Sequence, residues 1–160
     1  MIKNNKNIKK SGFTLIEVLV VIGIVGILAT VVLAAVNPSR QFKQARDSQR
    51  LANINAILNA VGQNMVDHEG NIFCDGQILS LIPGEKYPIT SPLTTGNSAD
   101  LASCLVPDYL TKMPYDPGLN YAKYVSETDY NTGYSMSIDS LGRVTIMAGG
   151  ELNGEISVTR

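Results

Sequence analysis

The sequence predicts an α+β fold in which a long N-terminal α-helix packs on a C-terminal antiparallel sheet of three to four strands. Three observations support this prediction. Residues 13–36 are almost wholly apolar, an amphipathic helical pattern follows over residues 37–68, and residues 121–160 hold short runs of β-branched and aromatic residues. Residues 69–120, between the amphipathic pattern and the strand-like runs, carry many turn-forming residues and are predicted to be a structured loop region.

The first twelve residues are predicted to be a basic leader beside a membrane. They hold four of the thirteen basic residues of the chain, Lys3, Lys6, Lys9 and Lys10. Basic residues next to an apolar segment favour the cytoplasmic side of the membrane. The rest of the chain has nine basic against fourteen acidic side chains, a balance of −5. This acidic balance argues against nucleic-acid binding, because such binding needs clustered Lys and Arg.

Residues 13–36 are predicted to form a membrane-spanning helix. They are apolar apart from Thr14, Glu17 and Thr30. At about 1.5 Å per residue this helix is roughly 36 Å long, which is enough to cross a bilayer core of about 30 Å. The alternative is an ordinary cleaved signal peptide that ends at Ala34 and Ala35, but its apolar region would be shorter, about 7 to 15 residues.

The second half of the predicted helix is amphipathic. We expect a kink or short break at Pro38, because proline lacks an amide hydrogen and disfavours helical angles in the preceding residue. Beyond it, apolar residues recur at steps of three and four, at Leu51, Ile54, Leu58, Val61 and Met65. The remaining faces are polar, with Arg40, Lys43, Arg46, Asp47, Arg50 and Asn53. This pattern predicts a helix that lies on a folded domain and stops near Gly70.

The C-terminal third is predicted to be an antiparallel meander. The strand-like runs are residues 121–126, 134–139, 143–148 and 155–159. Turn signals separate them at Asn131–Gly133, at Ser140–Gly142 and at Asn153 with Gly154. We expect one face of this sheet to cover the amphipathic helix.

The junction between the leader and the apolar segment is the most specific feature of the sequence. It reads Lys9-Lys10-Ser11-Gly12-Phe13-Thr14-Leu15-Ile16-Glu17. A carboxylate within a membrane span is costly, about 2.5 to 3.5 kcal/mol at mid-helix and less toward an end. Glu17 could reach the lipid headgroups from its place near the helix end. Over residues 9–38, however, the sequence resembles the type IV pilins and the pseudopilins of type II secretion and competence systems.

The resemblance implies a type IV pilin fold and a role for each residue of the junction. Prepilin peptidase would cleave after the basic pair Lys9 and Lys10, between Gly12 and Phe13. The new Phe13 amine would be N-methylated and would pair with Glu17 of a neighbouring subunit. Opposite charges of this kind relieve each other's desolvation when helices bundle out of water.

The resemblance also implies the function and the partners. The chain would be a single-pass precursor in the inner or cytoplasmic membrane. It would then become a structural subunit of an extracellular or periplasmic filament, polymerised through its N-terminal helix. Its partners would be other copies of itself, prepilin peptidase, an assembly ATPase and a platform protein. The alternatives are a pseudopilin of a secretion or competence system, and a minor tip pilin that binds DNA or a surface.

Two cysteines, Cys74 and Cys104, lie in the predicted loop region. In the cytosol they would be incidental thiols, whereas outside the cell they can pair, and closing such a loop stabilises by roughly 3 to 4 kcal/mol. We predict a Cys74–Cys104 disulfide once the chain is exported. Two buried free thiols are the alternative, because sequence alone does not place their Cβ atoms within bridging distance.

No enzyme, metal or cofactor is predicted. The segment Pro114–Pro117 resembles one in the major pseudopilins, which hold calcium nearby, but the aromatic-glycine step that follows it there is absent. The acids Asp116, Asp129 and Asp139 are candidate calcium ligands, although such acids are more often solvated loop residues. His68 has no recognisable catalytic partner and is interpreted as a charge at a helix C-terminus. The sequence contains no phosphate-binding loop, zinc-ligand spacing or nucleophile motif.

Overall fold

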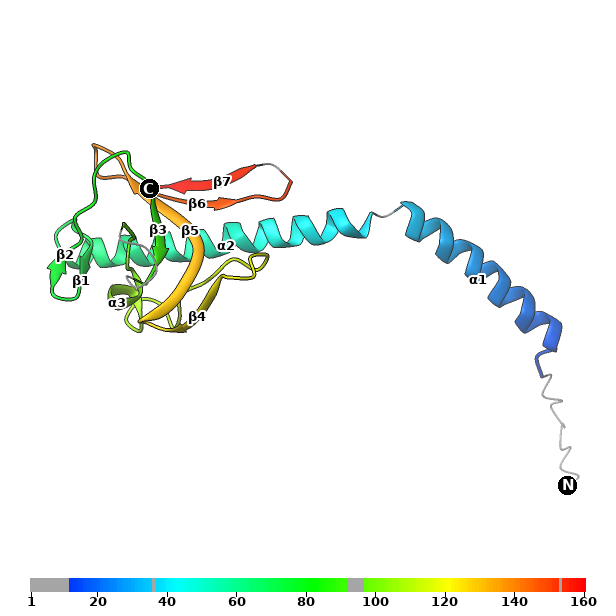
Figure 1. The fold of residues 1–160 in the computed structure, drawn as a ribbon. Helices are drawn as coiled ribbons and strands as arrows, with labels where there is room; N and C mark the ends of the chain where they lie inside the picture. Colours follow the sequence, from blue (N-terminus) through cyan, green and yellow to red (C-terminus); the bar gives the residue numbers. More distant parts are fainter. Residues whose placement is uncertain (1–11, 36, 92–96, 153) are drawn as a thin grey trace, which may run out of the picture. The chain divides into compact units, whose positions relative to one another are not determined.

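The computed structural model describes residues 12–35, 37–91, 97–152 and 154–160. The predicted leader residues 1–11, Lys9 and Lys10 among them, lie outside these ranges. The chain forms two compact units that divide after Pro38, and each is described by itself. In chain order the elements (Figure 1) are α1 Leu15–Ala35, α2 Pro38–Asp67, β1 Phe73–Cys74, β2 Gln77–Ile78, β3 Tyr87–Thr90, α3 Ala102–Leu105, β4 Lys123–Ser126, β5 Asp129–Ile138, β6 Val144–Gly149 and β7 Glu155–Thr159.

Helix α1 is apolar on all sides. Its large apolar side chains, from Leu15 to Leu33, are each more than half exposed within the chain. A helix with no polar face needs an apolar environment, which is a membrane or a bundle of other helices. The segment Leu15–Leu33 is long and apolar enough to cross a membrane.

Helix α2 contributes one side of the hydrophobic core of the second unit. Its first residue is Pro38, and proline suits this position because the first amides of a helix have no intrahelical partner. The predicted stripe is confirmed at Ile54, Leu58 and Val61, which are buried. Leu51 was wrongly placed on it, since this side chain is 44% exposed. The buried face of α2 instead runs through Arg50, Ile54, Ile57, Leu58, Ala60, Val61 and Asn64.

The sheet confirms the predicted α+β class but has five strands rather than three or four. Strand β5 is central: it pairs with β3 and β4, and with β6, which in turn pairs with β7, all in antiparallel fashion. Strand β3 comes from the region predicted to be loop. It is only four residues long and contains Pro88, and a proline argues against a strand in sequence-based reasoning. Proline is tolerated here because β3 is an edge strand.

The predicted turn at Asn131–Gly133 is wrong, because these residues lie within β5. The β4–β5 connection turns instead between Ser126 and Asp129, which are paired. The pairing of β3 with β5 is irregular between Pro88 and Thr90. Gly133 lies opposite this irregularity with a φ of 74°, and an added Cβ would meet Leu119 at 2.8 Å. The glycine therefore marks a bulge and a close approach of the neighbouring loop, not a turn.

Candidate functional site

The predicted processing junction precedes the first helix. Gly12 and Phe13 lie before α1 and belong to no helix or strand. The Phe13 side chain is 84% exposed, and a Cβ added to Gly12 would meet nothing within 4 Å. An uncrowded peptide bond outside any helix or strand suits a peptidase, so the geometry is compatible with cleavage at this point. Cleavage between Gly12 and Phe13, and methylation of Phe13, stay predictions.

Thr14 and Glu17 form a capping box at the start of α1. The Glu17 amide donates to Thr14 Oγ1, while the Thr14 amide and hydroxyl both donate to Glu17 Oε2, each at 3.3 Å. This reciprocal arrangement satisfies backbone amides that the first helical turn leaves without partners. The Thr-x-x-Glu pattern was available in the sequence as a capping signal, but Glu17 was interpreted there only through its charge.

The capping box determines where the Glu17 charge lies. The carboxylate is held at the N-terminal end of α1, where the helix dipole favours a negative charge. An amine created at Phe13 would belong to the residue just before the cap. A carboxylate accepts several hydrogen bonds, so the bonds from Thr14 leave capacity for an ammonium group. The predicted pairing of Glu17 with Phe13 of a neighbouring subunit is chemically feasible and stays a prediction.

The predicted kink or short break at Pro38 also stays a prediction. Helix α1 ends at Ala35 and α2 begins at Pro38.

A cluster of charged side chains in the second unit was not predicted. Arg50 is 3% exposed, and its Nε and Nη2 donate to the two carboxylate oxygens of Asp116 at 2.7 and 2.9 Å. Its Nη1 donates to Asp47 and Glu151 at 2.8 and 2.9 Å, and Arg46 binds Glu151 as well. We call these five residues the ion-pair cluster. It joins α2 to the loop before β4 and to the β6–β7 hairpin.

Four members of the ion-pair cluster, Arg46, Asp47, Arg50 and Glu151, stay charged at neutral pH. Hydrogen bonds with Asp116 raise the pKa of Arg50. Hydrogen bonds from Arg46 lower the pKa of Glu151 to about 2, and the backbone amide of Glu151 lowers the pKa of Asp47. Groups with these pKa values do not exchange protons near pH 7, so the arrangement serves to hold elements together rather than to carry out acid–base chemistry.

The three candidate calcium ligands are each engaged by a cation of the chain. Asp116 is not a solvated loop residue as expected, because it is 2% exposed and binds Arg50. Asp129 pairs with Lys123, and Asp139 pairs with Arg143. In the part of the chain that the structure describes, no three acidic, histidine or cysteine side chains form a group that could hold a metal ion.

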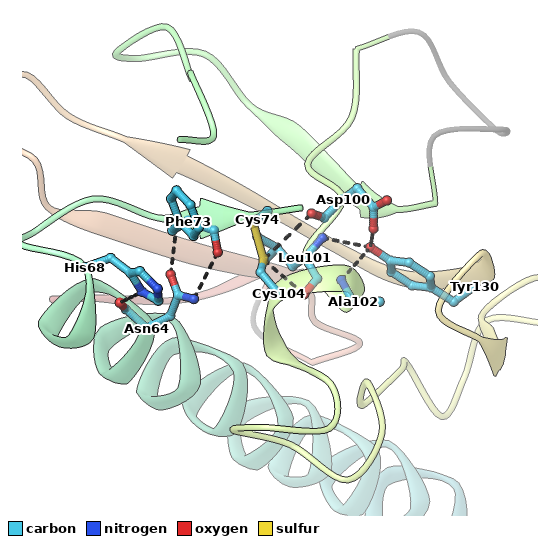
Figure 2. Close-up of a disulfide and its surroundings, with 9 residues drawn as sticks. All are labelled: Asn64, His68, Phe73, Cys74, Asp100, Leu101, Ala102, Cys104 and Tyr130. Carbon is cyan, nitrogen blue, oxygen red and sulfur yellow. Dashed lines mark hydrogen bonds between the residues drawn. A yellow bond between two sulfur atoms is a disulfide. The ribbon is translucent and has the colours of Figure 1, made fainter. Parts of the chain in front are cut away.

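The predicted disulfide is present. Cys74 of β1 and Cys104 of α3 are bonded, with their Cα atoms 4.4 Å apart (Figure 2). Beside it, Asn64 of α2 accepts a hydrogen bond from the Phe73 amide and donates to the Phe73 carbonyl. The segment after α2 is thus hydrogen-bonded to α2 through Asn64 and covalently bonded to α3 through the disulfide.

His68 also contacts both α2 and the segment that follows it. Its Nδ1 lies 2.7 Å from the Asn64 carbonyl, to which it donates, and its ring stacks on Phe73 with the centroids 4.8 Å apart (Figure 2). The interpretation as a charge at a helix end correctly located His68 just after α2, but it omitted the ring stacking. Packing across the turn at residues 69–72 could not be inferred from a single histidine.

Tyr130 anchors the start of α3. Its hydroxyl donates to Asp100 at 2.7 Å and accepts from the amides of Leu101 and Ala102 at 2.9 and 3.2 Å (Figure 2). Burial raises the pKa of Tyr130 and of Asp100. The buried tyrosine therefore works as a structural hydrogen-bonding group that ties α3 to the central strand.

Comparison with known proteins gives one match. Residues 7–33 match the prokaryotic N-terminal methylation motif. The match covers the end of the basic leader, the junction and nearly all of α1, and it includes no residue of the second unit. No curated protein and no solved structure matches the chain.

Proposed function

We propose that this chain, which carries the N-terminal methylation motif that is the hallmark of type IV pilins and pseudopilins, is a structural subunit of a type IV pilus-like filament. The motif family is structural rather than enzymatic, and we propose that this protein is likewise not an enzyme. The single observation that carries the proposal is Glu17, an acidic residue in the first turn of a helix that is otherwise apolar apart from Thr30.

The proposed pathway begins with a membrane-anchored precursor. Helix α1 holds the chain in the inner or cytoplasmic membrane, and prepilin peptidase removes residues 1–12. The new amine of Phe13 is methylated and pairs with Glu17 of a neighbouring copy. An assembly ATPase and a platform protein then drive transfer of α1 from lipid into a bundle of equivalent helices outside the membrane.

The physical support for this pathway is the environment that α1 needs. Apart from Glu17, its large side chains are apolar and exposed within the chain, so α1 must be covered either by lipid or by other copies of the helix. Gly23 and Gly26 leave open space on its surface, which permits close approach of a second helix. Glu17 favours the bundle over lipid only if a positive group meets it there.

The proposal is tested with two substitutions at Glu17. Gln can replace Glu in a capping box, so Glu17→Gln keeps the helix start and removes only the charge, whereas Glu17→Ala removes both. We expect both precursors to be cleaved, giving a mature chain that begins at Phe13 by N-terminal sequencing. We also expect both to give almost no sheared filaments. Normal filament yield from Glu17→Gln would show that the charge is not needed, and a mature chain that begins elsewhere would refute the processing step.

The alternatives differ from this proposal in the length and composition of the filament. A pseudopilin would form a short periplasmic filament, and a minor tip pilin would be scarce along sheared filaments. The segment Pro114–Pro117, which resembles one in the major pseudopilins, favours the pseudopilin alternative, although its Asp116 is paired with Arg50. A DNA-binding tip is disfavoured by the acidic balance of the chain without its leader.

A further inference from the structure

A groove on the second unit lies between α2 and the β5–β6 connection. Its volume is about 850 Å³. Buried Leu58 and Val61 belong to its lining, together with two apolar side chains that are unusually exposed, Val66 at 81% and Leu141 at 77%. We call it the α2 groove. Two such side chains lining one groove make up an apolar surface that the described part of the chain leaves uncovered.

Gly62 lies in the lining of the α2 groove and has no evident role within the chain. It is in the interior of a 30-residue helix, where glycine costs about 1 kcal/mol relative to alanine. Its φ is not positive, and an added Cβ would meet nothing within 4 Å. Neither backbone strain nor internal packing therefore requires a glycine here. A glycine at this place does allow another molecule to approach the helix backbone closely.

The α2 groove carries opposite charges at its two ends. Arg160 lies at the end next to Asn59, to which it donates a hydrogen bond. Asp67 lies at the other end. Eight helical residues separate Asn59 from Asp67, which is a rise of roughly 12 Å. An occupant should therefore be apolar at its middle, acidic at one end and basic at the other, over about that length.

The β4–β5 hairpin of the same protein has this pattern. Lys123 and Val125 are exposed on one face of β4, because alternate residues of a strand share a face, and Glu127 follows in the turn. The strand rises roughly 10 Å from Lys123 to Ser126, and Glu127 follows in the next position. Val125 is 66% exposed. The Lys123–Asp129 ion pair is half exposed, and exposed pairs of this kind contribute little, so Lys123 can exchange partners.

The hairpin and the groove cannot satisfy each other within one chain. Strand β4 pairs with the start of β5, at residues 129–131, whereas the β5–β6 connection that lines the groove follows the end of β5 at Ile138. Two different complementary patches at opposite ends of the long central strand produce a head-to-tail contact, and such contacts repeat without closing into a ring unless the rotation returns to its start. An open repeat is the symmetry that a filament needs.

We propose that the β4–β5 hairpin of one copy binds in the α2 groove of the next copy. Val125 covers Gly62 and contacts Val66, Glu127 meets Arg160, and Lys123 meets Asp67. This inference rests on the proposed function, since the filament supplies the second copy. It adds a contact between the folded units to the contact between the N-terminal helices.

Cysteine cross-linking in filaments tests the contact directly. Cells would produce two versions of the full chain together, one with Val125→Cys and one with Val66→Cys. The native cysteines are already paired, so they do not compete. After mild oxidation of sheared filaments we expect a covalent dimer. The matched control replaces Val66→Cys by Ile82→Cys, which changes another exposed side chain outside the groove (61%) and should give no dimer.

Substitution of Gly62 gives a second test, in which a loss of filaments would not be explained by a loss of folding stability. Gly62→Ala and Gly62→Leu should both raise the thermal midpoint of the domain, because both residues are better helix formers than glycine. Only leucine fills the groove, so we expect filament yield to fall about fivefold with Gly62→Leu and less with Gly62→Ala. Unchanged yield with Gly62→Leu, or filaments without the Val125→Cys to Val66→Cys dimer, would overturn this inference alone. Absence of filaments from the unmodified chain would overturn the proposed function instead.

Discussion

Replacement of Asp116 by asparagine tests the importance of the ion-pair cluster for the second unit. Asp116→Asn keeps the shape of the side chain and removes the negative charge that receives two hydrogen bonds from Arg50. Removal of one partner from a buried ion pair costs about 3 to 5 kcal/mol, because the other charge is left buried with less compensation. Arg50 keeps Asp47 and Glu151 on Nη1, so we expect the lower end, about 3 kcal/mol.

The assay is urea unfolding of the full chain in a mild detergent, followed by near-ultraviolet circular dichroism. All seven tyrosines lie between residues 87 and 134, so the signal reports the second unit whatever α1 does in the micelle. Urea is preferred to guanidinium chloride, because a salt would screen the charges under study. The free energy of unfolding is compared at pH 7 between the variant and the unmodified chain.

Asp129→Asn is the matched control. It removes the same kind of charge from the Lys123–Asp129 pair, whose two side chains are each 53% exposed. Exposed pairs contribute about 0 to 1 kcal/mol, so the control should be nearly neutral. The double variant Arg50→Met with Asp116→Leu should recover part of the stability, because both members of the buried pair are removed together, whereas Asp47 and Glu151 lose the partner that Arg50 supplied. If Asp116→Asn costs no more than Asp129→Asn, the cluster does not stabilise the unit as argued.

Two further predictions concern acid and reductant. The pKa of Glu151 is about 2 in the folded chain and near 4.5 when unfolded, so its stabilisation is complete above about pH 4.5 and is lost as the pH falls through 2. Glu151→Gln should therefore have a lower free energy of unfolding than the unmodified chain at pH 7, and the difference should disappear near pH 2. A difference in unfolding free energy that stays constant with pH in urea unfolding would contradict this. The Cys74–Cys104 bond closes a loop with a sequence separation of 30, so its reduction should cost roughly 3 to 4 kcal/mol, and an unchanged unfolding midpoint in reductant would count against that cost.

The sequence predicted the helices better than the sheet, for physical reasons that particular residues illustrate. Long periodic or uniformly apolar patterns repeat the same signal many times, so one misplaced residue such as Leu51 does not change the prediction. Strand β3 offers four residues and a proline, and only its pairing with β5 makes it a strand. Gly133 signals an exceptional backbone position, but a turn and a bulge share that signal and only the partner strand distinguishes them.

The ion-pair cluster shows what local patterns cannot supply. Arg50 lies four residues before Ile54 on the buried face of α2, so a charge on that stripe was a sign that a buried partner exists. The partner is 66 residues away in a loop, and nothing in the spacing identifies Asp116 among the acids of the chain. A sequence can thus indicate that a charge must be compensated without indicating the residue that compensates it.

Arg50 and Glu17 are charged residues on otherwise apolar helix faces, and they differ in their ion-pair partners. This difference supports the proposal that the chain assembles with copies of itself. Arg50 has three carboxylate partners from its own chain. Among the residues that the structure describes, Glu17 has hydrogen bonds from Thr14 but no ion pair. A capping box needs only the carboxamide of glutamine, so capping alone does not require a charge at position 17. If Glu17→Gln leaves α1 helical and the precursor cleaved but abolishes filaments, assembly requires the charge at position 17, as expected if it pairs with the proposed amine of a neighbouring Phe13.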